Sequence, residues 1–254
     1  MTVTLFGPGW FVVLLAVAAV GVLAHLVLRG RTMGRRRRGL AVLAGVDVLA
    51  SVVFHVAYLT DPDVHFPLWQ NLPLHLCTIV SYLVLPAVLT TYRPVQTLCF
   101  FPGAVAGLLA CFSAAPMYFG HDLLSAKTCF FVAHLLNFVI PVLMASLGLY
   151  RPTYADAARA VLYAVVLGLT VLPVTLLLRA VADPGANYMF VFDPEGAALL
   201  EAFHRLVPVP VLYLVPLIVA VLPVFVLQVW VYRRAAGVRT AAPSAPGSLT
   251  PAAG

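Results

Sequence analysis

Seven long apolar stretches run through the chain, and they restrict its possible folds more than any other feature. They lie at about residues 10–28, 40–59, 72–90, 95–115, 128–149, 157–181 and 207–232. Each is close to the roughly 20 apolar residues that a helix needs to cross the hydrocarbon core of a bilayer. Little sequence is left between them for a sizeable soluble domain. We therefore predict an all-α polytopic membrane helix bundle, with seven transmembrane helices in one domain over residues 1–234.

The charged residues make up only 9% of the chain, and they are distributed unevenly between the connections. In a seven-span bundle, twelve basic residues fall on one side: Arg29, Arg31, Arg35, Arg36, Arg37, Arg38, Arg93, Arg151, Arg159, Arg233, Arg234 and Arg239. Seven acidic residues fall on the other: Asp61, Asp63, Asp122, Asp183, Asp193, Glu195 and Glu201. Because basic connections stay in the cytoplasm, we predict an integral plasma-membrane protein with its N-terminus outside and its C-terminus cytoplasmic. The net charge of +6 reflects this asymmetry, so no nucleic-acid partner is expected.

The end of the chain and the cysteines narrow the prediction further. Residues 235–254 are rich in Ala, Pro, Ser and Gly, a composition typical of segments without fixed structure, and we predict a disordered cytoplasmic tail there. The four cysteines have no CxxC spacing: Cys77, Cys99, Cys111 and Cys129. Without a metal-ligand pattern, we expect neither a metal site nor a cofactor.

A polar cluster opens the third apolar stretch, where side chains that hydrogen-bond or ionise are costly and usually functional. If the stretch is helical throughout, residues three, four and seven apart share a face. One stripe is then Gln70, Pro73, Cys77 and Ser81, and the other is Asn71, His75, Thr78 and Tyr82. His75 would point about 200° away from Cys77. We predict that this helix is central and that Gln70, Asn71 and His75 bind substrate.

The fifth apolar stretch carries a matching polar face. His134 lies seven residues past Lys127, as Cys77 lies seven past Gln70, so both would sit about 10 Å below the outer boundary of the membrane. A buried thiol is unreactive, but a neighbouring histidine can remove its proton. We therefore predict Cys77 as nucleophile and His134 as its base. Asn137, one turn further, would bind substrate or an oxyanion.

Each of these residues also has a purely structural interpretation. A cysteine in a span often packs as a small hydrophobe, and amides can simply join helices. Cys111 and Cys129 also lie towards the outer side, so Cys77 is not the only candidate thiol. Asp47 and His25 share a deeper level, where a structural pair is favoured over a proton relay.

The longest outer connection spans residues 183–205. It contains Asn187-Tyr188-Met189-Phe190, followed by Asp193-Pro194-Glu195. The second motif has an N-cap residue, a proline and an acid in the order that starts a helix, and we predict a short surface helix to about Arg205. We predict that the Asn187–Phe190 segment covers the outer mouth of the site and that Asn187 and Tyr188 bind substrate. The alternative is that the aromatics form only an interfacial belt.

Three motifs in order resemble one known family. They are LPLHLC at residues 72–77, a histidine in the outer half of the fifth span, and GANYMF followed by DPEG in the outer loop. The chain resembles the YwaF-type bacterial integral membrane proteins, which are related to transmembrane protein 164 of animals. The resemblance implies seven spans, a bacterial source and lipid acyltransferase activity. It also implies that the nucleophile and the histidine of the family correspond to Cys77 and His134.

The sequence leaves three classes of function open. The first hypothesis is a membrane-embedded acyltransferase or acyl hydrolase that acts on phospholipids through a thioester on Cys77. The alternative is a transport or ligand-binding protein with a polar core and no catalysis. A third is a haem protein in which His75 pairs with His55 or His134. Covalent acyl loading on Cys77 would separate the enzyme from the other two.

Overall fold

The computed structural model describes residues 1–62 and 67–237. The helices of this part of the chain are α1 (Pro8–Leu28), α2 (Met33–Leu59), α3 (Leu76–Thr90), α4 (Arg93–Leu98), α5 (Ala104–Ser113), α6 (Cys129–Ser146), α7 (Tyr154–Val181), α8 (Ala198–Leu206) and α9 (Leu214–Ala235). A π-helical turn at Cys99–Gly103 joins α4 to α5. Two short strands, β1 (Thr2–Val3) and β2 (His121–Asp122), pair antiparallel. The all-α polytopic bundle is therefore confirmed.

Six of the helical segments described are long and apolar enough to cross a membrane: α1, α2, residues 93–113, residues 126–146, α7 and α9. The predicted third span corresponds to α3, which is apolar but has only 15 residues, or about 22 Å of helix. The count of seven spans thus stays a prediction. The tail predicted for residues 235–254 lies, from residue 238 on, outside the described residues.

Three predicted helix starts were wrong. Helix α3 begins at Leu76 rather than near residue 72, because Pro73 lacks an N–H and disfavours helical geometry in the residue before it. Helix α9 begins at Leu214 rather than near residue 207, after the two prolines Pro208 and Pro210. The predicted surface helix exists as α8, but Asp193-Pro194-Glu195 forms a turn before it, and Ala197 is the N-cap residue.

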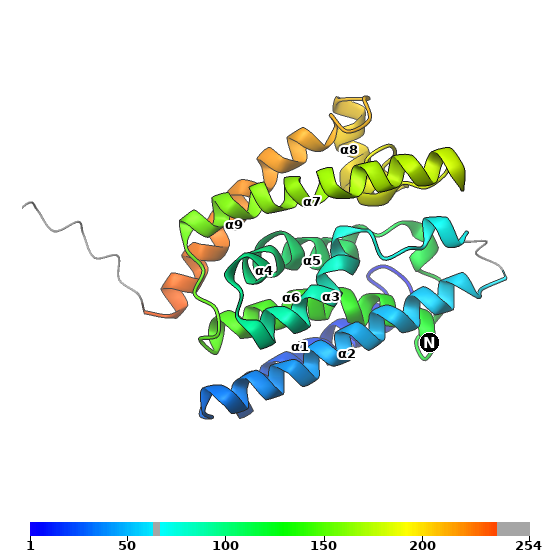
Figure 1. The fold of residues 1–254 in the computed structure, drawn as a ribbon. Helices are drawn as coiled ribbons and strands as arrows, with labels where there is room; N and C mark the ends of the chain where they lie inside the picture. The colour runs from blue at the N-terminus through cyan, green and yellow to red at the C-terminus, as the bar shows by residue number, and fades with distance from the viewer. Residues whose placement is uncertain (63–66, 238–254) are drawn as a thin grey trace, which may run out of the picture.

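The helices form three layers (Figure 1). Helices α1 and α2 lie on one side, α7 and α9 on the other, and α3 to α6 between them. Among the six long segments the one containing α6 is the most buried and α9 the least. Helix α6 also carries His134 and Asn137, which are both buried. This agrees with the rule that polar residues of membrane helices face the interior of the bundle.

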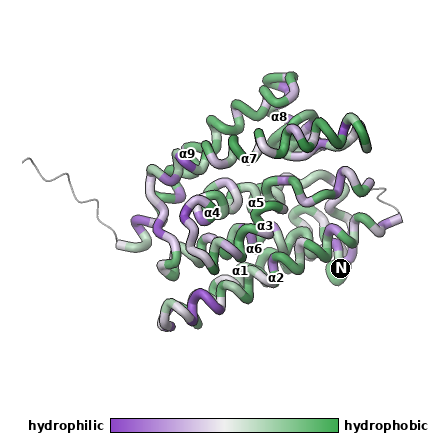
Figure 2. Tube along the Cα trace, in the orientation of Figure 1, coloured by the Kyte–Doolittle hydropathy of each residue, from purple (hydrophilic) through white to green (hydrophobic). Residues whose placement is uncertain are grey.

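Polar residues gather at the two ends of the bundle, and apolar residues cover the helices between (Figure 2). At one end Arg36 donates to the carbonyl of Leu147 at 2.8 Å, and Arg93 forms a salt bridge with Asp156. At the other end β1 pairs with β2, and Lys127 forms a salt bridge with Asp61. The basic connections that the sequence assigns to the cytoplasm therefore share one end.

Reporter fusions test the orientation of this bundle in the membrane. We expect fusions after Arg93 and after Arg151 to behave as cytoplasmic, and a fusion after Asp122 to behave as external, because basic connections are retained in the cytoplasm. The measurement is paired alkaline phosphatase and fluorescent-protein activity. A cytoplasmic fusion after Asp122 would reverse the topology.

Candidate functional site

A cavity of about 460 Å³ lies between α7–α9 and the middle layer. This volume is within the range of small-molecule sites, roughly 300–1,000 Å³. Most of its lining is apolar. Its polar lining residues include His55, Gln70, Asn71, His75, Cys77, Thr78, Ser113, Tyr118, His134 and Glu195. Five predicted site residues thus meet in one cavity: Cys77, His134, His75, Asn71 and Gln70.

Cys77 occupies the first turn of α3, directly after the N-cap residue His75 and Leu76. The first N–H groups of a helix have no intrahelical acceptor and favour a negative charge nearby. Burial has the opposite effect, because it disfavours the charged thiolate. The carbonyl of Cys77 accepts hydrogen bonds from Asn137 Nδ2 at 2.9 Å and Ser81 Oγ at 3.3 Å. The start of α3 is therefore fixed against α6, one turn below His134.

His134 is held in one tautomer. Its Nδ1–H donates to the carbonyl of Phe130 at 2.7 Å, and the side chain is only 2% exposed. Because Nδ1 carries the proton in this bond, the lone pair lies on Nε2. His134 lines the cavity with Cys77. Its ring therefore has the protonation state that a general base requires.

His55 has the same arrangement, and sequence reasoning missed it as a candidate base. Its Nδ1–H donates to the carbonyl of Ser51 at 2.7 Å, which leaves Nε2 unprotonated. His55 lies in the last turns of α2 and lines the same cavity. Its position near the outer end of a predicted span, as for His134, was the available signal. Within the described residues, no three His, Cys, Asp or Glu side chains are grouped to hold a metal ion.

The helical stripes predicted from residue 70 onwards were wrong before α3, because residues 71–75 are not helical. Gln70 ends a short 3₁₀ turn, Leu68–Gln70, and His75 is extended. His75 therefore lines the same cavity as Cys77, and its ring packs against those of Phe190 and Tyr188. The matched-depth argument for Cys77 loses its basis for the same reason.

Gln70 and Asn71 connect the cavity wall to neighbouring segments. Asn71 Nδ2 donates to the carbonyl of His55 at 2.9 Å, and Gln70 Nε2 donates to Asp183 Oδ2 at 3.0 Å. The amide of Asn137 is occupied by Cys77 and by Ser81 Oγ, also at 2.9 Å. His25 contacts Ser146 Oγ at 3.1 Å, so the structure does not support the expected pair with Asp47. These side chains hold backbone and helices in position.

The predicted covering segment, Asn187–Phe190, divides into two pairs of residues. Met189 and Phe190 line the cavity, whereas Asn187 and Tyr188 are buried behind it. The hydroxyl of Tyr188 donates to the carbonyl of Trp69 at 2.7 Å and accepts from the N–H of Leu72 at 2.9 Å. Asn187 and Tyr188 therefore fasten the loop.

Asn187 fixes the turn that carries Glu195. Its Nδ2 donates to the carbonyl of Asp193 at 2.7 Å and to Glu195 Oε1 at 2.8 Å, while its Oδ1 accepts from the N–H of Phe192. Glu195 lines the cavity. Burial raises the pKa of Glu195, and the nearby charge of Asp193 adds to the effect. The cavity lining thus contains a carboxyl group that the sequence analysis did not name as a site residue.

Tyr118 is another cavity residue that the sequence did not indicate. Its ring stacks on Phe130, with centroids 4.1 Å apart and an angle of 15°. Its phenol lies within electrostatic range of Cys77 and Glu195. Tyr118 ends the 3₁₀ turn Pro116–Tyr118 in an outer connection, and only the folded chain brings it to the cavity.

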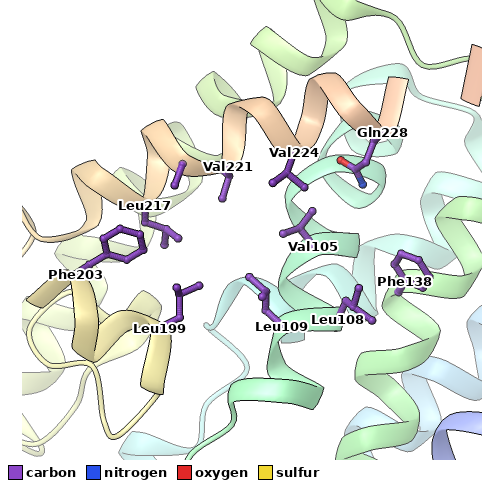
Figure 3. A pocket seen from close by; sticks show the side chains of 11 residues that line it. Val105, Leu108, Leu109, Phe138, Leu199, Phe203, Leu217, Val221, Val224 and Gln228 are labelled. Atoms are coloured by element: carbon purple, nitrogen blue, oxygen red, sulfur yellow. The ribbon is translucent and has the colours of Figure 1, made fainter. Parts of the chain in front are cut away.

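A second cavity of about 320 Å³ adjoins the first (Figure 3). Apart from Gln228 its lining is apolar, and the side chains come from α5, α6, α8 and α9. The two cavities share the lining residues Val105, Leu109, Leu199, Leu217 and Val221. The chamber of Cys77 and the space between α8 and α9 are therefore neighbouring cavities with apolar side chains in common.

The fold and this site define a multi-pass α-helical membrane protein whose interior holds a thiol and three imidazoles in a largely apolar cavity. The chain belongs to the TMEM164 family, whose family model matches residues 5–229. The resemblance drawn from the three sequence motifs is thereby confirmed. No curated protein and no solved structure matches the chain.

Proposed function

We propose that this protein is a membrane-embedded lipid acyltransferase, or acyl hydrolase, that works through a thioester on Cys77. The observation that carries the proposal is the joint cavity of Cys77 and His134. Its apolar lining and the adjoining cavity suit an acyl chain. Its substrates would be membrane phospholipids, reached near the outer leaflet of a bacterial plasma membrane.

The first half-reaction would load the enzyme. Nε2 of His134 takes the proton of the Cys77 thiol, and the thiolate attacks the acyl carbon of a lipid ester. The C–S bond forms and the ester C–O bond breaks. The imidazolium returns its proton to the departing lysolipid oxygen. The Tyr118 phenol and the first N–H groups of α3 are the donors available to the oxyanion.

The second half-reaction would unload the thioester. A lysolipid hydroxyl gives its proton to His134 and attacks the thioester carbon, so that a new ester forms and the thiolate is released and reprotonated. Water in place of the lysolipid gives hydrolysis. The apolar lining limits access of water, which favours transfer between lipids.

Acyl loading is the direct test. Purified protein incubated with a phospholipid bearing a radiolabelled acyl chain should acquire a covalent label that hydroxylamine removes. The Cys77→Ala variant should not label, and Cys129→Ala should, because Cys129 is also only partly buried but is not a lining residue of the cavity. Label that persists in Cys77→Ala would contradict the proposal. Lipid retained without covalent label would favour the ligand-binding function.

Asn187→Ala should lower acyl transfer by about tenfold or more while protein level stays normal. The substitution removes three hydrogen bonds of the outer loop, and each unsatisfied buried partner costs about 1–3 kcal/mol. The loop then covers the cavity less firmly. The measurement is lipid acyl exchange in membranes.

Asp193→Asn is the matched control for Asn187→Ala. It keeps the backbone carbonyl that Asn187 binds and the Oδ1 that accepts from the N–H of Glu195. Its exchange rate should stay near that of the wild type. Full activity in Asn187→Ala would leave the loop with an interfacial role only.

A further inference from the structure

A second polar cluster lies in the bundle, next to the cavity but distinct from the thiol and imidazoles that line it. Asp47 and Ser51 are one turn apart on α2, Ser81 is on α3 and Asn137 is on α6. All four side chains are buried, with Asp47, Ser51 and Asn137 at 0% exposure. Helix α2 packs against both α3 and α6. The cluster therefore sits where three helices meet.

The hydrogen bonds of this cluster leave it with more acceptors than donors, because only the Ser51 hydroxyl keeps a hydrogen without a partner. Asn137 Nδ2 uses its two hydrogens on the carbonyl of Cys77 and on Ser81 Oγ. Ser81 Oγ gives its own hydrogen to the carbonyl of Cys77. The Ser81 hydroxyl faces the carboxyl group of Asp47, and it can donate to that group only by giving up its bond to the carbonyl of Cys77.

Four oxygen atoms of the cluster are consequently unsatisfied. Within residues 1–62 and 67–237, no hydrogen bond of standard geometry is formed by either carboxylate oxygen of Asp47, by Ser51 Oγ or by Asn137 Oδ1. The ion pairs described in this part of the chain involve other carboxylates, those of Asp61 and Asp156. A buried carboxylate requires a counter-charge or a proton. A single proton supplies one donor, whereas a small cation can contact several oxygens at once.

The geometry points to a binding site for a dehydrated small monovalent cation, with sodium as the ion of matching chemistry, formed by Asp47, Ser51, Ser81 and Asn137. Carboxylate, hydroxyl and amide oxygens are the ligands of hard cations. One carboxylate neutralises one positive charge, so a monovalent ion leaves the site neutral. A divalent ion would leave a net charge in an apolar interior, which is costly.

The site shares atoms with the cavity above it. The carbonyl of Ser51 accepts from His55 Nδ1, and Asn137 and Ser81 both hold the carbonyl of Cys77. An ion bound to Ser51, Ser81 and Asn137 would therefore also fix residues that hydrogen-bond to the His55 ring and to the backbone of Cys77. The inference does not depend on acyl transfer.

Thermal unfolding of the purified protein tests the site without an activity assay. At equal ionic strength, Tm should be higher in sodium chloride than in choline chloride and should rise with sodium concentration, because an ion that binds only the folded state stabilises it. Asp47→Asn should unfold at the same temperature in both salts. Asp122→Asn, an exposed carboxylate at the outer end, should keep the full sodium response.

Ser51→Ala is a second variant that tests the site even if the Asp47 variant does not fold. It removes one oxygen and keeps the carboxylate, so the sodium concentration that gives half of the Tm increase should rise about tenfold. Equal Tm values for the wild type in sodium and choline would overturn the proposal and assign a proton to Asp47. A sodium response that persists in Asp47→Asn would overturn it as well.

Discussion

Replacing Cys77 with alanine should reduce lipid acyl exchange to background, a loss on the order of 10³-fold or more. The thioester cannot form without the sulfur. His134→Ala should cost about as much, and the double variant no more than either single one, because a nucleophile and its base act as a unit. Cys77→Ser should also be severely impaired, since a hydroxyl is far harder to deprotonate than a thiol. Acyl exchange between phospholipids in isolated membranes measures all four variants.

The controls for this series are the other thiols and the second imidazole. Cys111→Ala and Cys129→Ala should keep exchange near the wild-type rate. His55→Ala separates the two histidines, because both present an unprotonated Nε2 in the cavity. Retained exchange in Cys77→Ala would refute the nucleophile. Loss in His55→Ala with activity in His134→Ala would move the role of base to His55.

Adding a side chain at Gly107 should unfold the site. A Cβ atom there would lie 2.5 Å from the carbonyl oxygen of His134 and 2.9 Å from Cβ of Asn137. Because the first neighbour is backbone, α5 must move away from α6. Overpacking of this kind costs about 1–3 kcal/mol or more. Gly107→Val should lower Tm strongly, and Gly107→Ala should lower it by a smaller amount.

Gly45→Ala is the matched control for Gly107. Gly45 is also a helical glycine, but a Cβ there meets no atom within 4 Å. Alanine at such a position stabilises a helix by up to about 1 kcal/mol, so Tm should stay level or rise. Wild-type stability in Gly107→Ala would mean that α5 and α6 are not in the close contact described.

Hydropathy predicted the membrane segments well, because a segment in lipid must satisfy its backbone hydrogen bonds within its own helix. It failed at two helix starts, where a proline lies near the beginning of the apolar stretch. Pro73 lies inside the predicted third span and Pro208 inside the seventh, and both helices start after these residues. Apolar composition alone does not distinguish a helix from an apolar segment packed against the protein.

The candidate site was predicted in part. Cys77 and His134 do line one cavity, although the depth calculation for Cys77 assumed a helix that is absent. His55 and Tyr118 were missed because their proximity to Cys77 depends on how α2 and an outer connection pack. Asn137 was expected to face substrate, but its amide hydrogens are taken by neighbouring backbone and hydroxyl groups. Hydrogen-bond partners of this kind arise from tertiary contacts that a single sequence does not specify.

The shortness of α3 has a consequence for how lipid reaches the thiol. A helix of about 22 Å cannot span a hydrocarbon core of about 30 Å. If the C-terminal end of α3 lies at the cytoplasmic surface of the membrane, its first turn lies below the opposite surface. The peptide groups of residues 68–75 would then be at membrane depth, where they are tolerated only when covered by protein. Tyr188 gives this cover through Trp69 and Leu72. A phospholipid could keep its headgroup at the surface while its ester reaches Cys77 by lateral diffusion, without extraction into water.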